Sequence, residues 1–423
     1  MPSLVHTPLS RRHALGLGAA SMLGTGTLAR AADAEQRRFL FVHCIGGWDP
    51  FMVFAPLFGE SRIELEAAAA PAQVGDLAFI DHPDRPAVTD FFSRWADHTS
   101  LVLGVESPSV NHTTCTRLML TGDGASGTDD WGAILAAVAP DTPLLPMVAL
   151  SGPWFARTHA AAVVPVGERG QLASLLDGSA LTEVDLPVVG PDPSVQDLLD
   201  SFVMDRTRDR LEAASDTQVR TVLEAANEAQ LRRMELLAES DSLRLGRTGV
   251  LAGDLDRAVE LLETGLSRCV RLGYLGFDGT GFDTHSLNFR QSASFQELFA
   301  ALDGVLTALS SRAGPSGSSL LSETVVVVTS EMGRHPQING REGREHWTWT
   351  AAMLCGGGLV GGQTLGGWTS DMTGQPVDLA TGFASEGGET LNARHLGATL
   401  LALGDVDPSA AGLSERPLSA LLP

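Results

Sequence analysis

Residues 323–358 read ETVVVVTSEMGRHPQINGREGREHWTWTAAMLCGGG and carry the clearest signal of the fold. Residues 324–329 form a short β-branched apolar run, the pattern of a strand buried on both faces. Glu331 follows this run, and His346 lies just before a second apolar run at residues 351–355. Because ligands of open α/β sheets lie at the carboxyl ends of strands, we expect Glu331 and His346 to meet at one sheet edge. The alternative is a solvated loop that carries charged residues.

The rest of the chain alternates between short apolar runs and amphipathic segments. We expect strands at residues 39–45, 101–105, 146–151, 161–165 and 271–277, and helices at residues 295–309 and 391–403. Residues 193–270 differ, because apolar residues recur there at helical spacing between charged ones. We interpret about 193–270 as a mostly helical insertion in an α/β domain, with a solvated surface of Arg and Glu pairs.

Length, charge and cysteine content argue against several classes of protein. A chain of 423 residues is long enough for two average domains or for one large α/β domain with an insertion. The net charge of −22 argues against nucleic-acid binding, which needs clustered Lys and Arg, and the chain contains no lysine. None of the four cysteines belongs to a CxxC pair, so a zinc ribbon is not expected.

Residues 1–31 are expected to form a targeting segment. Ser-Arg-Arg at residues 10–12 precedes a mild apolar stretch, and Ala-Arg-Ala at residues 29–31 offers a small-residue cleavage site. This arrangement resembles a twin-arginine signal, which predicts a periplasmic or secreted protein whose mature domain covers residues 32–423. No other run of about 18 apolar residues occurs, so we expect no stable membrane span after signal removal. The alternative is a basic disordered N-terminus.

Two further strand ends carry possible metal ligands. Asp49 follows the first expected strand after one tight glycine turn, and Asp283 and His285 closely follow a later strand. A carboxylate and an imidazole at one strand end suit zinc, manganese or iron better than calcium. With Glu331 and His346, these residues would supply three carboxylates and two imidazoles to a divalent metal. The alternative for Asp49 is a side chain that caps the turn.

A block of hydroxyl side chains follows the second expected strand. Thr113 and Thr114 precede an apolar pattern that indicates the first turns of a helix, closed by Gly122. Hydroxyls at a helix N-terminus are either caps or nucleophiles held in a positive field. Arg117 in this helix and Arg334 after the central strand are candidates to stabilise charge that develops on a reacting ester.

A glycine-rich segment at residues 356–361 formally matches the GxGxxG dinucleotide-binding pattern after a strand. The residues that follow it carry no helical pattern, and the dinucleotide motif requires a helix there. We therefore interpret this segment as a glycine loop close to the site.

Together these blocks resemble an exported bacterial family of unknown function that is similar to the alkaline phosphatase and sulfatase superfamily. The resemblance rests on the order of the motifs: an Asp after the first strand, a hydroxyl block that ends Leu-Thr-Gly, then Phe-Asp-Thr-His, Thr-Ser-Glu-Met-Gly-Arg, and Glu-His before a strand. It covers most of the mature chain except the helical insertion. It implies a mostly parallel central sheet with helices on both faces, and an anionic ester substrate, either a small molecule or a polymer.

The resemblance also implies roles for single residues. Asp49 would bind metal beside a Ser, Thr or formylglycine nucleophile. Counting back from the Leu-Thr-Gly end of the hydroxyl block reaches His112 or Thr113, so His112 joins the candidate metal ligands. No Cys-x-Pro-Ser-Arg motif is present, which makes formylglycine chemistry unexpected. Hydroxyl attack by Thr113 or Thr114 is expected in its place, or no covalent step.

The remaining motifs match the superfamily only in part. Asp283, His285 and His346 match metal-ligand positions, whereas Glu331-Met332 stands where the superfamily usually has Asp-His, so that one ligand is missing. Two hypotheses follow. One is an exported metal-dependent hydrolase of phosphate or sulfate esters, and the other is a non-catalytic binding or scaffold protein that retains the fold. The sequence identifies neither a substrate nor a protein partner.

Overall fold

The central feature is an eight-stranded sheet with the strand order β12-β4-β11-β8-β1-β7-β5-β6. The computed structural model describes residues 37–139, 142–167, 171–176, 192–239 and 245–423, so the expected signal at residues 1–31 lies outside the described residues. The chain divides into Met1–Arg30 and Ala31–Pro423, and every described residue belongs to the second unit. The strands of the sheet are β1 (Arg38–Cys44), β4 (Thr99–Glu106), β5 (Met147–Ala149), β6 (Val163–Pro165), β7 (Cys269–Tyr274), β8 (Thr324–Ser330), β11 (Trp349–Gly356) and β12 (Gln363–Gly366).

Neighbouring strands of this sheet run parallel except where β11 is involved. Strand β11 runs antiparallel to both β4 and β8, whereas β1 pairs in parallel with β7 and β8. The predicted α/β class with a mostly parallel sheet is therefore confirmed. The run of four valines in β8 is fully buried, as expected for a strand covered on both faces.

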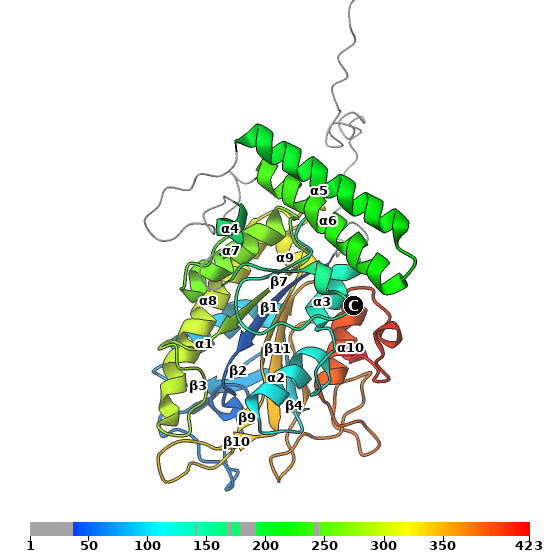
Figure 1. The fold of residues 1–423 in the computed structure, drawn as a ribbon. Helices are drawn as coiled ribbons and strands as arrows, with labels where there is room; N and C mark the ends of the chain where they lie inside the picture. Colours follow the sequence, from blue (N-terminus) through cyan, green and yellow to red (C-terminus); the bar gives the residue numbers. More distant parts are fainter. Residues whose placement is uncertain (1–36, 140–141, 168–170, 177–191, 240–244) are drawn as a thin grey trace, which may run out of the picture. The chain divides into compact units, whose positions relative to one another are not determined.

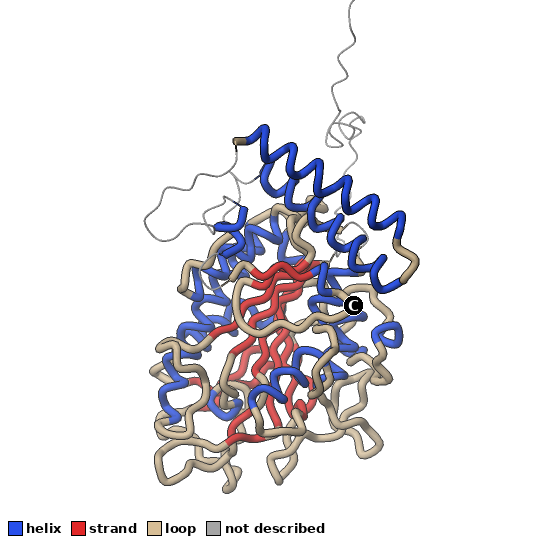
Figure 2. The backbone as a smooth tube through the Cα atoms, viewed as in Figure 1, coloured by secondary structure: helices blue, strands red, loops and turns tan. Residues whose placement is uncertain are grey.

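Helices cover both faces of the sheet (Figures 1 and 2). Side chains of a strand alternate between its faces, so Leu40 and Val42 of β1 pack into one core and Phe39 and Phe41 into the other. The first core contains residues of α1 (Pro86–Trp95), α7 (Leu251–Glu263) and α8 (Gln291–Ser311). The second contains residues of α2 (His112–Thr121), α3 (Trp131–Ala137) and α10 (Ala393–Leu403).

Shorter elements complete the described chain. Two small sheets pair β2 (Ala70–Val74) with β3 (Leu77–Asp81) and β9 (Gly333–Arg334) with β10 (His346–Trp347). The other short helices are α4 (Gln171–Leu176), α9 (Leu320–Glu323), η3 (Pro50–Met52), η4 (Ala96–His98), η5 (Ala160–Ala162), η8 (Asn288–Arg290), η9 (Pro408–Ala411) and η10 (Ser419–Leu421).

The described residues of the segment 193–270 form three helices and the start of a strand. Helices α5 (Pro193–Ala213) and α6 (Thr217–Glu239) pack against each other, at the end of the sheet away from β9 and β10 (Figure 1). Helix α7 instead packs against the sheet and α8, so the last part of the segment belongs to the main core. Of the described helices, none is both long and apolar enough to span a membrane.

The reversed strand β11 determines which loops meet. Ala352 of β11 pairs with Thr329 near the end of β8, and Trp349 pairs with Glu106 at the end of β4. The start of β11 therefore lies at the same sheet edge as the carboxyl ends of β1, β4, β7 and β8. Loops from all five strands converge at this edge, although they come from distant parts of the sequence.

Candidate metal centre

Three histidines surround one aspartate at this edge. The Nε2 atoms of His285 and His346 are 3.0 Å apart, and each lies 3.2 Å from Oδ1 of Asp283. Nε2 of His112 lies 3.3 Å from Oδ2 of the same carboxylate. The ligand atoms of His112, Asp283 and His346 are all within 4.8 Å of one another. The structure thus brings together four of the six predicted metal ligands.

Each of these imidazoles is held through its other nitrogen. Nδ1 of His112 lies 2.8 Å from Oε1 of Glu331, and Nδ1 of His285 lies 2.7 Å from Oε2 of Glu345. Nδ1 of His346 lies 2.8 Å from the backbone carbonyl oxygen of Val110. The carbonyl or carboxylate accepts a hydrogen bond from the Nδ1–H group, so that Nε2 of the neutral ring carries the lone pair. Hydrogen bonds of this kind orient the histidine ligands of metals.

The donor set fits a divalent cation. The lone pairs on Nε2 of His285 and Nε2 of His346, which are 3.0 Å apart, repel each other unless a proton or a cation lies near both. In addition, Nε2 of His112 is buried without a hydrogen-bond partner among the described residues. Ligands of a tetrahedral zinc ion with bonds of about 2.0–2.1 Å are separated by roughly 3.3 Å, close to the spacings around Asp283. Three imidazoles and one carboxylate therefore match zinc, and also suit manganese or iron.

Glu331 lies behind the cluster rather than in it. Its buried carboxylate accepts hydrogen bonds from the Gly46 N–H at 2.7 Å and from the Ser330 hydroxyl at 3.1 Å, besides contacting His112. Burial alone would raise the pKa of Glu331, but the hydrogen bond from His112 and the other donors hold it below its usual value. Glu331 was predicted as a metal ligand, and its contacts instead make it the group that orients His112.

His43 of β1 supports Glu331 from the sheet. Its Nε2 lies 3.8 Å from Oε2 of Glu331, and its Nδ1 lies 3.4 Å from the hydroxyl of Thr329. Burial lowers the pKa of His43 to about 4, so the ring is neutral at pH 7. His43 belongs to none of the sequence motifs, and its only signal is a polar residue inside an otherwise apolar strand.

Arg334 holds Asp283 in place. Its buried guanidinium lies 2.6 Å from Oδ1 of Asp283 and also donates to the backbone carbonyls of Gly46, Gly47 and Arg344. Burial would raise the pKa of Asp283, but the hydrogen bond and charge of Arg334 lower it to about 2. Since every nitrogen of Arg334 is engaged, it acts here as a positioning residue, not as the free charge-stabilising group that was predicted.

Asp49 is not brought into the cluster. Its Oδ2 lies 2.9 Å from Nε of Arg344 and accepts a hydrogen bond from Asn288 at 2.7 Å, while Oδ1 accepts the N–H of Phe51 at the start of η3. The prediction of Asp49 as a metal ligand is therefore corrected. Its buried carboxylate is neutralised by Arg344, a residue from the 323–358 stretch whose partner could not be identified from sequence spacing.

The hydroxyl block lies beside His112 at the N-terminus of α2. Thr113 is exposed and makes no side-chain hydrogen bond with a described residue, whereas the hydroxyl of Thr114 lies 3.3 Å from Oδ1 of the capping residue Asn111. Gly122 closes the helix with a φ of 72°, as predicted. Arg117 lies one helical turn beyond Thr113, with its guanidinium 5.5 Å from the ring of Phe155 and not at the cluster.

Glu345 and its neighbour Asn339 were also missed. Glu345 contacts His285 at 2.7 Å and accepts a hydrogen bond from Asn339 at 2.7 Å, so that it orients the imidazole from the solvent side. The signal for Glu345 was present, because a carboxylate adjacent to a candidate ligand is a frequent orienting partner. Glu345 is next to His346 in the sequence, but in the structure its carboxylate contacts His285, which comes from another loop.

Comparison with solved structures finds only low similarity. A protein in the alkaline phosphatase superfamily from Vibrio parahaemolyticus has 10% identity, covers 92% of this chain and 71% of its own, and gives a TM-score of 0.37. The phosphonate monoester hydrolase of Agrobacterium radiobacter has 9% identity, covers 92% and 78%, and gives 0.36. Ps i-CgsB in complex with k-i-k-neocarrahexaose has 9% identity, covers 90% and 74%, and gives 0.38.

Comparison at the level of sequence is more decisive. No curated protein matches this sequence. A protein-family model matches residues 83–407, a range that begins before α1 and includes all four residues of the cluster. This match spans well over half of the chain. The chain therefore belongs to the family described as protein of unknown function (DUF1501).

Proposed function

We propose that the protein is an exported metal-dependent hydrolase of phosphate or sulfate esters. The observation that supports it is the convergence of three imidazole Nε2 atoms on Asp283, each ring being held through Nδ1 by an acceptor. His112, Asp283, His285 and His346 would hold the ion. A divalent ion bound there would polarise an ester oxygen and lower the pKa of a bound water or hydroxyl.

The cluster is accessible to a substrate. The side chains of Asp283, His112 and His285 are 40%, 36% and 33% exposed, whereas Glu331 and Arg334 behind them are fully buried. Thr113 adds an exposed hydroxyl at the helix N-terminus, where backbone N–H groups favour anions. These features suit a small-molecule or polymeric anionic ester that approaches from solvent, with Thr113 as the candidate nucleophile.

A second candidate is a non-catalytic binding protein that retains the fold. Two observations favour this candidate. The carboxylate of Asp49 forms an ion pair with Arg344, so it is not a metal ligand. The guanidinium of Arg334 donates its hydrogen bonds to backbone carbonyls and to Asp283, so it does not face a substrate. The described residues then offer ligands for about one ion.

Metal analysis combined with turnover separates these candidates. Purified protein should contain about one divalent ion per chain, as four donors of this kind predict. The loaded protein is then assayed with p-nitrophenyl phosphate and p-nitrophenyl sulfate, with Asp283→Asn as the control. Metal-dependent release of nitrophenol supports the hydrolase, bound metal without turnover supports the binding protein, and a protein free of metal contradicts the site itself.

A further inference from the structure

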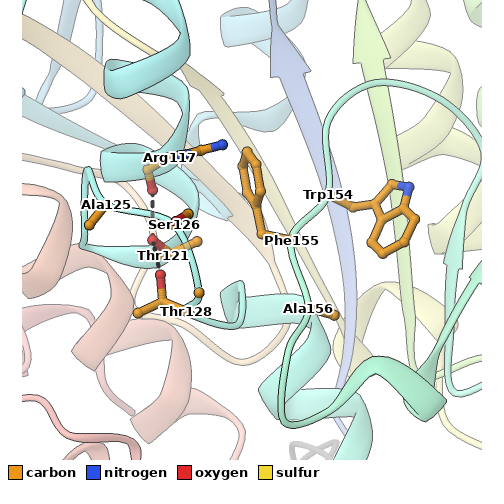
Figure 3. A pocket seen from close by; sticks show the side chains of 9 residues that line it. Arg117, Thr121, Ala125, Ser126, Thr128, Trp154, Phe155 and Ala156 are labelled. Carbon is orange, nitrogen blue, oxygen red and sulfur yellow. Dashed lines mark hydrogen bonds between the residues drawn. The ribbon is translucent and has the colours of Figure 1, made fainter.

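A second site lies farther along α2. A pocket of about 190 Å³ is enclosed by the end of α2, the loop at residues 125–128 and the loop at residues 154–156. Figure 3 shows Arg117 extending toward the ring of Phe155, with Thr121, Ser126 and Thr128 gathered nearby. None of the four cluster residues lines this pocket. It is therefore distinct from the candidate metal centre.

Two arginines, Arg117 in the wall of this pocket and Arg157 next to it, form no ion pair with a described residue. Within the described part of the chain, Nε of Arg117 is buried without a hydrogen-bond partner, and its guanidinium lies 5.5 Å from the ring of Phe155. Arg157 lies against Gly127 of the pocket wall, where an added Cβ would be 3.2 Å from its Nη1. A buried guanidinium nitrogen without a partner is costly, so Nε of Arg117 is a donor that a bound anion would satisfy.

The nearby carboxylates do not neutralise these arginines. Asp123 accepts the N–H of Ala125 at 2.8 Å, and Asp129 accepts the N–H groups of Arg157, Thr158 and His159. These hydrogen bonds direct Asp123 toward its own loop and Asp129 toward the backbone of residues 157–159. They hold the pKa of Asp129 below its usual value, although burial acts to raise it. Both carboxylates thus accept hydrogen bonds from the backbone, and neither forms an ion pair with Arg117 or Arg157 among the described residues.

The pocket also offers a hydroxyl and an aromatic wall. Thr128 donates to Thr121 at 3.1 Å, whereas the exposed Ser126 hydroxyl makes no hydrogen bond with a described residue. A volume of about 190 Å³ corresponds to roughly six water molecules and is smaller than a pocket for a drug-sized ligand. We propose that this pocket binds a small organic anion: Arg117, with Arg157 and Ser126, holds its phosphate, sulfate or carboxylate, and a single ring packs against Phe155.

Calorimetric titration of the full chain tests this proposal. The probes are inorganic phosphate, inorganic sulfate and phenyl phosphate, in buffer with a metal chelator. We expect saturable binding of one phenyl phosphate per chain, tighter than inorganic phosphate because the ring gains contact with Phe155. Arg117→Gln should lower the affinity about tenfold or more, since a charged hydrogen-bond donor is lost. Arg206→Gln, on the exposed surface of α5, is the matched control and should leave binding unchanged.

Three outcomes would overturn the proposal. They are no saturation of the wild type up to about 10 mM phenyl phosphate, equal affinity in Arg117→Gln, or loss of binding in Asp283→Asn. Loss of binding in Asp283→Asn would show that the anion binds at the metal cluster instead of this pocket. The titration therefore tests the pocket separately from the proposed hydrolase. If Arg117→Gln does not fold, Ala125→Phe fills the pocket from its exposed rim and should abolish binding without lowering the melting temperature.

Discussion

The four residues of the cluster should act as one unit. Asp283→Asn and His346→Ala are each expected to lower metal affinity without unfolding the chain, because Asp283 lies in a loop, His346 lies in the short strand β10, and neither belongs to a core. The double variant should lose less than the sum of the two, since residues that share one ion are not additive. Metal titration of both single variants and the double variant measures this.

The matched control is Asp278→Asn, in the same loop as Asp283 but bonded to Thr280 and Arg290. It should leave metal affinity unchanged. Near-zero, additive effects of Asp283→Asn and His346→Ala would show that these two residues do not share an ion, and the metal centre would have to be abandoned.

His43 predicts a pH dependence of stability. Its pKa is lowered from 6.5 to about 4 by burial, so between these values the unfolded chain binds a proton that the folded chain does not. The free energy of unfolding should therefore fall as the pH drops from 6.5 to 4, by up to about 3 kcal/mol from this group. Urea unfolding at several pH values should show a smaller loss in His43→Gln than in the wild type.

The exposed His98 provides the comparison for this measurement, and His98→Gln should keep the full loss of stability. An identical pH dependence in His43→Gln and the wild type would mean that His43 is not the buried neutral ring described here.

At the scale of elements, the glycine turn after β1 fixes the position of Asp283. Gly46 has a φ of 113°, and a Cβ added to it would lie 2.5 Å from the Phe282 nitrogen and 2.6 Å from the Asp283 nitrogen. Gly46→Ala should therefore displace the loop that carries Asp283, and lower both the melting temperature and the metal affinity. Thermal unfolding and metal titration measure the two effects.

Gly304→Ala is the control, because Gly304 lies within α8 and faces open space. Alanine should stabilise this helix by about 0.5–1 kcal/mol. If Gly46→Ala were as well tolerated as Gly304→Ala, the close approach of the two loops would be contradicted.

The elements were more predictable than the contacts between them. The valine run predicted β8, and Glu331 and His346 were expected at one edge because polar residues flank apolar runs there. That β11 is antiparallel depends on strand order, which a single sequence does not reveal. The same limit explains the wrong prediction for Asp49. An aspartate directly after a strand can be either a metal ligand or a cap. The ion pair with Arg344 distinguishes the two roles, and Arg344 lies far from Asp49 in the sequence. His43 carried no periodic signal at all.

At the scale of the whole molecule, export stays a prediction, because residues 10–12 lie outside the described residues. The double substitution Arg11→Lys and Arg12→Lys should stop export in a bacterial host and leave folded protein in the cytoplasm, since the arginine pair is an address read by a receptor. Cell fractionation with limited proteolysis measures location and folding together. Arg30→Lys, near the expected cleavage site, should still be exported, and normal export of the double variant would contradict the signal.

The separation of contacts along the chain has a consequence for the order of folding. His112 meets Glu331 across 219 residues, and Gly46 meets Glu331 across 285. A fragment that ends before Glu331 cannot form these contacts. Contacts between residues so far apart in the sequence also form slowly, because the long chain segment between them must first be closed into a loop. We therefore expect the cluster to form late in folding, so that its first appearance during refolding would report that β1, β4 and β8 have come together.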